Sequence, residues 1–441
     1  MNRTLIVIAV LVLSVPHMAV VTLGDDGRGG FGPRTWAEVL AADPRSAPLD
    51  TTADLHTALH QAISMSSATI DGADHAKMDR VAAALPPALA RDLGALLSAR
   101  NTCAALVQLG RSAATQLACA AALGELAEQR AGALEEAGAS LETEGCAPIM
   151  IGTAAFQILV GGPDATCYGN AGVIPSILIV DVGGDDTYPG HVGAGSGVAL
   201  ALDVGGSDIY TGAQGVGLRG IGLLLDLGSG SDVYATLWTH AAAQDGVGVI
   251  LDGGGDDTYL CALTCQGFGI GGGLGVGQGF GTGVLWDRAG NDVYRTWDWL
   301  GPGIWMGQGA GIQGGFGLLL DEQGDDTYAA LGRSQGYSRG ERSSGLLFDL
   351  DGNDRYAMQD ASGRGVAEDR AERAIFVDAG GVDAYEGPAP GRNNAIWFDP
   401  TFGRGIGMDC EPSLVLHCVG FDVLAETVKY PAIGPAPERQ L

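Results

Sequence analysis

Paired aspartates recur between residues 181 and 383, and side chains of this type and spacing could bind metal ions. Each pair belongs to a unit that reads Asp, any residue, usually Gly-Gly, any residue, Asp, any residue, Tyr, as in Asp252 to Tyr259 (DGGGDDTY). Successive tyrosines are between 22 residues (Tyr188 to Tyr210) and 35 residues (Tyr259 to Tyr294) apart. The eight first aspartates are Asp181, Asp203, Asp226, Asp252, Asp287, Asp321, Asp349 and Asp378, and the eight second aspartates are Asp186, Asp208, Asp232, Asp257, Asp292, Asp326, Asp354 and Asp383.

The chemistry that these residues offer is the binding of hard cations. Carboxylates beside glycine turns suit Ca²⁺, which takes about six to eight oxygen ligands, whereas Mg²⁺ demands a stricter octahedron. If the units stack at the strand spacing of about 4.8 Å, the aspartates form two ladders along one edge. Neighbouring carboxylates then repel by roughly 3.5 kcal/mol at an effective dielectric constant of about 20, and a cation would offset this repulsion. In the alternative, each aspartate accepts hydrogen bonds from the amides of its own turn, and no metal is needed.

Short apolar runs separated by glycine must position these pairs. A second phrase, Gln-Gly-x-Gly followed by Gly-x-Gly and aliphatic residues, lies between many of the units, as in Gln214 to Leu225. Runs this short predict buried strands rather than helices. Repeats of this kind bury their apolar face by stacking, so we expect a mainly β fold: a parallel β-solenoid, like a β-helix or β-roll, of about eight coils. The tyrosine and the aliphatic residue before the first aspartate should both point inward; a β-propeller and an antiparallel barrel are the competing folds.

Two of the units carry a resemblance to a known family. Ala-Gly-Asn-Asp-Val-Tyr at 289–294 and Asp-Gly-Asn-Asp-Arg-Tyr at 351–356 resemble the calcium nonapeptides of RTX, or haemolysin-type, proteins, and Gly255, Asp257 and Tyr259 match the Gly, Asp and large residue of that pattern. In that family the turn carbonyls and the aspartate bind Ca²⁺ between stacked coils of a parallel β-roll. The resemblance therefore implies a calcium-binding role for the eight second aspartates.

The region before the repeats has a helical period. Between Thr35 and about Gly138 apolar residues recur every three or four positions, which predicts four or five short helices. His56 and His60 lie four residues apart on one predicted helix face, but no third ligand has a useful spacing, so a solvated helix flank is the simpler interpretation. The predicted organisation is a signal peptide or N-terminal anchor (1–23), a small α-helical domain (24–150), the repeats (151–390) and a C-terminal cap (391–441), with the helices capping the other end of the stack.

Charge, cysteines and the first residues bear on location and partners. The chain has 52 acidic and 24 basic residues and a net charge of −28, which excludes nucleic acid and anionic membranes as natural partners and favours cations. An apolar run over residues 5–15 predicts an export signal, or a membrane anchor if it is not cleaved.

The eight cysteines predict disulfides between sequence neighbours, with reduced buried thiols as the alternative. The predicted pairs are Cys103 with Cys119, Cys146 with Cys167, Cys261 with Cys265, and Cys410 with Cys418.

The leading functional hypothesis is an exported, calcium-stabilised β-solenoid that acts as a structural or binding module in the periplasm, at the cell surface or outside the cell. Tryptophans offer the only other functional signal. Trp238, Trp297 and Trp299, near Trp286 and Trp305, would stack against carbohydrate if exposed and would be core or cap residues if buried. The alternative function is therefore a polysaccharide-acting β-helix enzyme, of the lyase or epimerase type, with a groove near residues 286–305 that includes Asp292, Arg295 and Asp298. No Ser-His-Asp or Cys-His order points to a catalytic centre.

Overall fold

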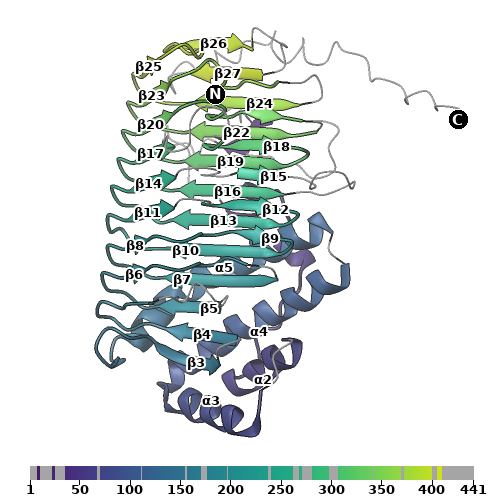
Figure 1. The fold of residues 1–441 in the computed structure, drawn as a ribbon, viewed down its shortest axis with the longest axis vertical. Coiled ribbons are helices and arrows are strands. Elements are labelled where there is room, and N and C mark those ends of the chain that lie inside the picture. The colour runs from purple at the N-terminus through teal and green to yellow at the C-terminus, as the bar shows by residue number, and fades with distance from the viewer. Residues whose placement is uncertain are drawn as a thin grey trace, which may run out of the picture.

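The computed structural model describes residues 7–9, 22–24, 35–66, 70–110, 112–153, 156–169, 176–195, 197–236, 240–261, 268–270, 281–296, 306–340, 342–368, 372–399 and 405–409. These residues form a mainly β structure with an N-terminal helical region (Figure 1). The helices are α1 (Trp36–Val39), η1 (Pro44–Ser46), α2 (Leu55–Met65), α3 (Gly72–Ala84), α4 (Pro87–Gly110) and α5 (Ala113–Gly138). The five α-helices match the predicted number, but α4 and α5 are long, with 24 and 26 residues.

Three long sheets hold the repeats. The 12-stranded sheet contains β3 (Ile149–Thr153), β4 (Phe156–Val160), β5 (Ser176–Asp181), β7 (Val198–Asp203), β10 (Ile221–Asp226), β13 (Val247–Asp252), β16 (Thr282–Asp287), β19 (Phe316–Asp321), β22 (Ser344–Asp349), β24 (Arg373–Asp378), β26 (Ala395–Phe398) and β27 (Gly405–Asp409). The 8-stranded sheet contains β6 (Thr187–Tyr188), β8 (Ile209–Tyr210), β11 (Val233–Thr236), β14 (Thr258–Cys261), β17 (Val293–Thr296), β20 (Thr327–Ala330), β23 (Arg355–Met358) and β25 (Ala384–Glu386). The 5-stranded sheet contains β9 (Gly217–Leu218), β12 (Ala242–Gln244), β15 (Phe268–Ile270), β18 (Ala310–Ile312) and β21 (Ser338–Arg339), and a separate hairpin pairs β1 (Val7–Ala9) with β2 (Thr22–Gly24).

Consecutive units visit the three sheets in the same order. The chain runs from β10 in the 12-stranded sheet to β11 in the 8-stranded sheet and β12 in the 5-stranded sheet, and then returns to the first sheet as β13. Equivalent strands pair in parallel and in register, so that Asp226 lies opposite Asp252 and Tyr234 lies opposite Tyr259. The repeated residues therefore form columns along the stack. Figure 1 shows the stacked strands from the side. Loops of different length between strands account for the variable spacing of the units.

The strands of the 12-stranded sheet are buried on both faces. Ala201, Leu224 and Ile250 face the tyrosine stack, while their neighbours Leu202, Leu225 and Leu251 belong to a second core that they share with the helices. The tyrosines point inward as expected. The expectation that the aliphatic residue before the first aspartate also points inward is wrong, because strand residues alternate between faces and the aspartate itself takes the inner face.

Glycine is abundant because two sheets touch backbone to backbone. A Cβ atom at Gly222, Gly248 or Gly345, each in the second position of a strand of the 12-stranded sheet, would overlap carbonyl oxygens of the chain segment that forms the 5-stranded sheet. The Gly-x-Gly phrases between the units thus allow close approach of layers as well as tight corners.

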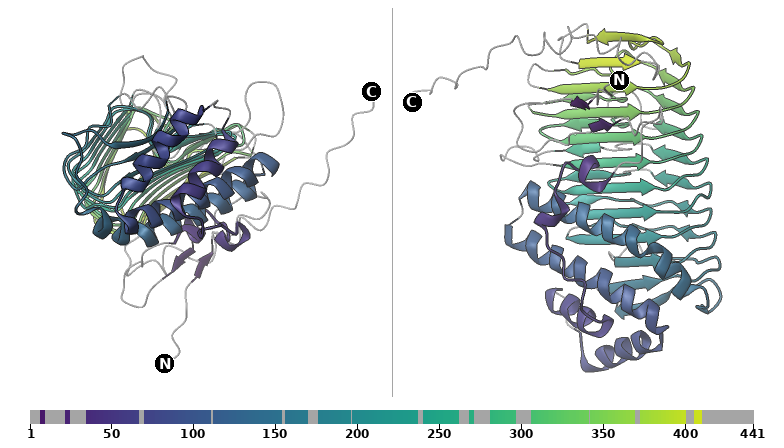
Figure 2. Two further views of the ribbon diagram at one scale, coloured as in Figure 1. Left: turned by 90° about the horizontal axis from the view of Figure 1, so that it is seen from below. Right: turned by 180° about the vertical axis from the view of Figure 1, so that it is seen from behind.

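The helices lie across the outer face of the 12-stranded sheet rather than only at its end (Figure 2). Helix α4 contacts β7, and α5 contacts β10 and β13, so the prediction of a simple end cap is wrong. Trp36 packs edge to face against Trp286 at 5.6 Å, and Arg288 forms an ion pair of 2.6 Å with Glu128 of α5. Buried aliphatic residues in every strand explain this arrangement, because the outer face of the sheet needs an apolar cover.

Antiparallel strands close both edges of the 12-stranded sheet. At one edge β3 pairs with β4, and at the other edge β26 pairs with β27. Most of residues 1–23 and residues 410–441 lie outside the described residues, including the predicted export signal and much of the predicted C-terminal cap. None of the helices in the described part of the chain has the length and apolar character needed to cross a bilayer.

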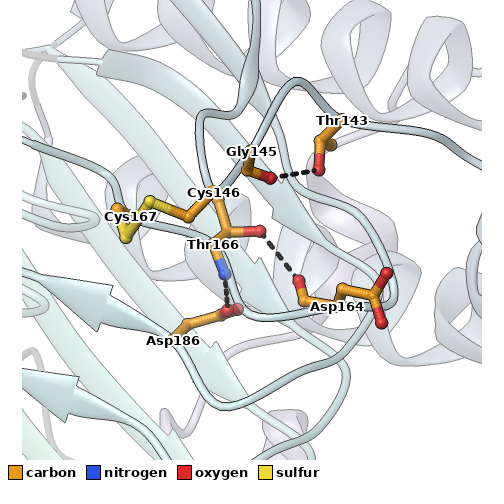
Figure 3. The surroundings of a disulfide bond; sticks show 7 residues. All are labelled: Thr143, Gly145, Cys146, Asp164, Thr166, Cys167 and Asp186. Atoms are coloured by element: carbon orange, nitrogen blue, oxygen red, sulfur yellow. Dashed lines mark hydrogen bonds between the residues drawn. A yellow bond between two sulfur atoms is a disulfide. The ribbon is translucent and has the colours of Figure 1, made fainter.

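The cysteines divide into two kinds. Cys146 and Cys167 form the predicted disulfide, with Cα atoms 5.1 Å apart (Figure 3). Cys103 and Cys119 are buried free thiols, so that predicted disulfide is wrong and the alternative holds. Burial raises the pKa of the Cys103 thiol, which disfavours the reactive thiolate. The other two predicted pairs include Cys265, Cys410 and Cys418, which lie outside the described residues.

Candidate metal centre

The first aspartate of each unit ends a strand of the 12-stranded sheet, and its two carboxylate oxygens have separate roles in every unit except that of Asp349, whose buried Oδ1 has no hydrogen-bond partner. In Asp226, Oδ1 accepts a hydrogen bond from the amide of Gly228 at 3.3 Å, which is the turn contact expected without metal. Its Oδ2 contacts the hydroxyls of Tyr210 and Tyr234 at 2.8 and 3.1 Å. Similar turn contacts occur at Asp181, Asp203, Asp252, Asp287, Asp321 and Asp378. The eight first aspartates are all buried.

The second aspartates form a ladder of their own. The amide of Asp232 donates to Oδ1 of Asp257 at 2.6 Å, and the amide of Asp257 donates to Oδ1 of Asp292 at 2.6 Å. The same contact links every neighbouring pair from Asp186 to Asp383. Seven of the eight side chains are buried, and Asp383, in the last predicted unit, is half-buried.

One oxygen remains without a hydrogen-bond partner in each second aspartate. It is Oδ2 in all eight cases, at Asp186, Asp208, Asp232, Asp257, Asp292, Asp326, Asp354 and Asp383. A buried acceptor that lacks a donor costs about 1–3 kcal/mol, and a charged one costs more. Such a cost repeated at the same atom of every unit indicates a missing positive partner, either a proton or a cation.

The orphaned oxygens lie close to other carboxylates. In at least four units the second aspartate lies with the first aspartates of its own and the next unit so that one carboxylate oxygen from each is within 4.8 Å of the others. Four of these triplets are Asp181, Asp186 and Asp203; Asp203, Asp208 and Asp226; Asp226, Asp232 and Asp252; and Asp252, Asp257 and Asp287. Oxygens at this separation leave room for a central cation with bonds of about 2.3–2.6 Å, so the donor set and its size fit Ca²⁺.

The sequence led us to expect ladders along an edge, but the structure places the carboxylates in the interior. Burial, with the neighbouring negative charges, raises the pKa of Asp232, Asp257 and Asp292 well above the usual range of a carboxyl group. The first aspartates behave alike: burial is the largest cause of the raised pKa at Asp226 and Asp252. Without a bound cation, many of these groups therefore have to keep a proton at neutral pH.

Stacked tyrosines link the first aspartates. Neighbouring rings from Tyr168 to Tyr356 are nearly parallel, with centroids 4.3 to 4.9 Å apart. The hydroxyl of Tyr210 contacts Asp203 of its own unit at 3.2 Å and Asp226 of the next unit at 2.8 Å. Because a hydroxyl carries one hydrogen, it can donate to only one of two carboxylates. The second contact is favourable only if that carboxyl is protonated or a cation lies beside it.

The residues that immediately precede the second aspartates form a third ladder, and these residues are exposed. Asn291 donates from its backbone and side-chain amides to Asp256, both at 2.9 Å, and Asn353 does the same to Asp325 at 2.8 and 3.0 Å. These hydrogen bonds lower the pKa of Asp256 and of Asp325. Aspartate and asparagine alternate from Asp256 to Asn353, and serine or valine occupies other positions of this ladder, so that no two carboxylates are neighbours. The buried ladders have no such alternation, which makes their uncompensated charge distinctive.

The structure also contains partial units that sequence reasoning missed. Tyr168 stacks on Tyr188. The amide of Thr166 donates to Asp186 (Figure 3), so Thr166 takes the place of a second aspartate. Gly161 takes the place of a first aspartate, because β4 pairs with β5 in register. At the other end Asp409 lies opposite Asp378 and accepts a hydrogen bond from Tyr385 at 2.7 Å. The aromatic spacing could have revealed the Tyr168 unit, but Asp409 has no tyrosine seven residues later.

The predicted tryptophan site is not assembled by the described residues. Trp238, Trp297, Trp299 and Trp305, together with Asp298, lie outside them. Trp286 is fully buried and donates its indole hydrogen to Glu322 at 2.8 Å, so it does not contribute to an exposed platform. Asp292 is buried whereas Arg295 is exposed, so these two residues do not share a surface.

Comparison with known proteins adds no assignment. No family model, curated protein or solved structure matches this chain. The function proposed below therefore rests on the geometry of the ladders.

Proposed function

We propose that this chain is an exported β-solenoid that Ca²⁺ stabilises and that acts as a structural or binding module in the periplasm, at the cell surface or outside the cell. One observation carries the proposal: the buried Oδ2 atom of every second aspartate has no hydrogen-bond partner. Parallel pairing in register across the three sheets supports the solenoid.

Each cation would bind between units. An ion in the triplet of Asp226, Asp232 and Asp252 would contact two consecutive units, and the next ion would share Asp252 with Asp257 and Asp287. A chain of shared ligands would join every unit to its neighbours and would oppose separation of the stack. Calcium fits better than magnesium because its coordination shell is larger and less regular.

Export is supported by the apolar N-terminal run and by the Cys146–Cys167 disulfide. Disulfides persist mainly in oxidising compartments. A rigid module with a net charge of −28 would also remain soluble and would repel other acidic surfaces.

The test is thermal unfolding of the full chain in excess chelator and then in millimolar Ca²⁺ or Mg²⁺. We expect the midpoint to rise steeply and selectively with Ca²⁺, because a ligand that binds only the folded state stabilises it. Equilibrium dialysis should give several bound Ca²⁺ ions per chain. A midpoint that does not respond to Ca²⁺ would reduce the aspartates to proton-bearing turn residues.

Two adjacent residues provide a matched pair of variants. Asp257→Asn removes a buried ligand with an orphaned oxygen, whereas Asp256→Asn changes an exposed aspartate of the third ladder. We expect the first variant to lose part of the calcium response and the second to keep it. Equal responses in the two variants would show that general charge, and not the buried site, controls stability.

The alternative, a polysaccharide-acting enzyme, stays a prediction. Its key residues Trp297 and Trp299 lie outside the described part of the chain, and the described residues near them do not converge on one surface.

A further inference from the structure

A second cluster of metal-binding side chains lies far from the aspartate ladders, between helices α2 and α3. His56 and His60 occupy adjacent turns of α2, and His75 and Asp79 occupy adjacent turns of α3. The sequence offered only the two histidines of α2, because the spacing from them to Asp79 has no recognisable pattern. Packing of the two helices supplies the missing third ligand.

The geometry of this cluster is that of a metal site. Oδ1 of Asp79 lies 3.4 Å from Nε2 of His56 and 3.2 Å from Nε2 of His60. In a tetrahedral zinc site with bonds of about 2.0–2.2 Å, neighbouring ligand atoms lie roughly 3.3–3.6 Å apart. One atom from each of the three residues lies within 4.8 Å of the others. The three donors could therefore close on one ion with only small side-chain rotations.

His75 lies next to the cluster and contacts His60. Its ring stacks on that of His60, with centroids 5.1 Å apart and planes 4° apart, and its Nδ1 atom is buried without a hydrogen-bond partner. A neutral imidazole nitrogen that lacks a partner is available as a ligand or as an acceptor for a metal-bound water. Three histidines and a carboxylate on the facing turns of two helices exceed what a solvated helix flank requires.

Helix α3 buries few of its own residues, although it also contacts β3. Only Met78 and Ala82 of its 13 residues are buried, whereas α2 buries five of its 11 residues. An ion shared by Asp79 and the two α2 histidines would fasten α3 to α2. The side chain of His56 is 64% exposed and that of Asp79 is 33% exposed, so one coordination position would face water.

We propose that His56, His60 and Asp79 bind a divalent transition-metal ion of the zinc class, with a water or His75 as the fourth ligand. Two imidazoles and one carboxylate select such ions over Ca²⁺ and Mg²⁺, which take oxygen ligands. This site is chemically separate from the carboxylate ladders and does not depend on whether they bind calcium.

The experiment is a Zn²⁺ titration of the full, chelator-stripped chain in saturating Ca²⁺, followed by calorimetry. Calcium is present so that the carboxylate ladders do not compete for zinc. We expect one Zn²⁺ per chain, and we expect Asp79→Asn and His60→Ala to weaken binding by roughly 100-fold or more, since even residues behind a ligand cost about 10–100-fold. His191→Ala, at an exposed histidine outside the cluster, should bind as the wild type does.

Two further readouts separate a metal site from a plain ion pair. Co²⁺ in place of Zn²⁺ should give visible absorption of tetrahedral type in the wild type and lose it in Asp79→Asn. Amide exchange in α3 should slow when Zn²⁺ is added to the wild type but not to either variant, and circular dichroism would verify that the variants are folded. A wild type that binds no Zn²⁺, or variants that bind it as tightly, would overturn the proposal.

Discussion

The hydroxyl of Tyr234 lies between two carboxylates, 3.1 Å from Asp226 of its own unit and 2.6 Å from Asp252 of the next. The same asymmetry occurs at Tyr210, Tyr294 and Tyr385, where the contact to the following unit is always the shorter one. At these four tyrosines the single hydroxyl hydrogen is therefore directed along the stack towards the C-terminal unit, whereas Tyr356 donates to Asp349 of its own unit at 2.8 Å. An aspartate that accepts from the preceding unit needs a proton or a cation where it also contacts its own tyrosine.

Removing one hydroxyl should destabilise the stack without creating a cavity. Tyr234→Phe leaves the ring in the column but removes the donor to Asp252, so we expect a loss of about 1–3 kcal/mol in the free energy of unfolding. Urea unfolding would measure it. Tyr337→Phe, at a tyrosine that is equally buried but outside the column, serves as control and should change stability less. A larger loss at Tyr337 would contradict the assigned role of the Tyr–Asp contacts.

Protein kept free of metal by excess chelator should become less stable as pH rises. Folding raises the pKa of the buried aspartates above their unfolded value of about 4, so the folded state binds more protons than the unfolded state between pH 4 and the raised values. The stabilisation is fully present below pH 4 and is lost as pH rises through the folded pKa values, by up to about 1.4 kcal/mol per pH unit for each group. Urea unfolding from pH 4 to pH 9 in chelator would show this slope.

Calcium should oppose the loss, because it replaces the protons. Asp257→Asn should reduce the dependence of the unfolding free energy on pH in chelator. High salt serves as a control for the net charge of −28, since salt screens exposed charges far more than buried ones. Stability that stays constant or increases between pH 5 and pH 9 in high salt and chelator would show that these carboxyls ionise freely in the folded protein.

The sequence predicted the columns of repeated residues but not what packs against each face of the sheets. Identical residues at one place in every unit predicted the tyrosine stack and the paired aspartates, because parallel strands in register align equivalent positions. Which face of a strand is covered depends on partners elsewhere in the chain. Nothing near Trp286 in the sequence indicates that Trp36 of α1 lies against it, or that helices cover Leu225 and Leu251. Asp79 could not be predicted as a partner of His60 for the same reason, because only the packing of α2 against α3 brings them together.

Glycine in the Gly-x-Asp-x-Tyr phrase should resist substitution. Gly255 has a φ of 152°, and a Cβ atom there would overlap the carbonyl oxygen of Gly230 in the preceding unit, in a column that repeats at Gly206, Gly290, Gly324 and Gly352. Gly255→Ala should therefore cost about 2–5 kcal/mol, because backbone atoms cannot move aside. Gly132→Ala in α5, where no atom lies within 4 Å, should stabilise the protein by up to about 1 kcal/mol. Chemical unfolding of both variants tests the pair, and a tolerated Gly255→Ala would contradict the close contact.

The four described cysteines of residues 103–167 should react differently with alkylating reagents. Cys103 and Cys119 are buried thiols, and burial raises the pKa of Cys103, so neither should be alkylated in the folded protein at neutral pH. Both should react after unfolding without reductant, whereas Cys146 and Cys167 should react only after reduction. Mass spectrometry of the alkylated peptides would show the pattern. Loss of the two thiols from protein isolated under oxidising conditions would instead indicate a disulfide between α4 and α5.

The junction between the helices and the sheet should depend on a short chain of contacts around Trp286. Trp36 donates to Glu128 at 2.8 Å, Glu128 pairs with Arg288, and the Arg288 guanidinium lies 4.6 Å from the centre of the Trp286 ring. Trp286→Ala should cost about 3–5 kcal/mol and should speed amide exchange in α1 and α5, because it removes the ring against which Trp36 packs. Phe398→Ala, at an aromatic residue that is 52% exposed, should change stability by no more than about 0.5 kcal/mol. If exchange in α1 and α5 stays slow in Trp286→Ala, the helices are held by the aliphatic face of the sheet alone and the tryptophan contact is dispensable.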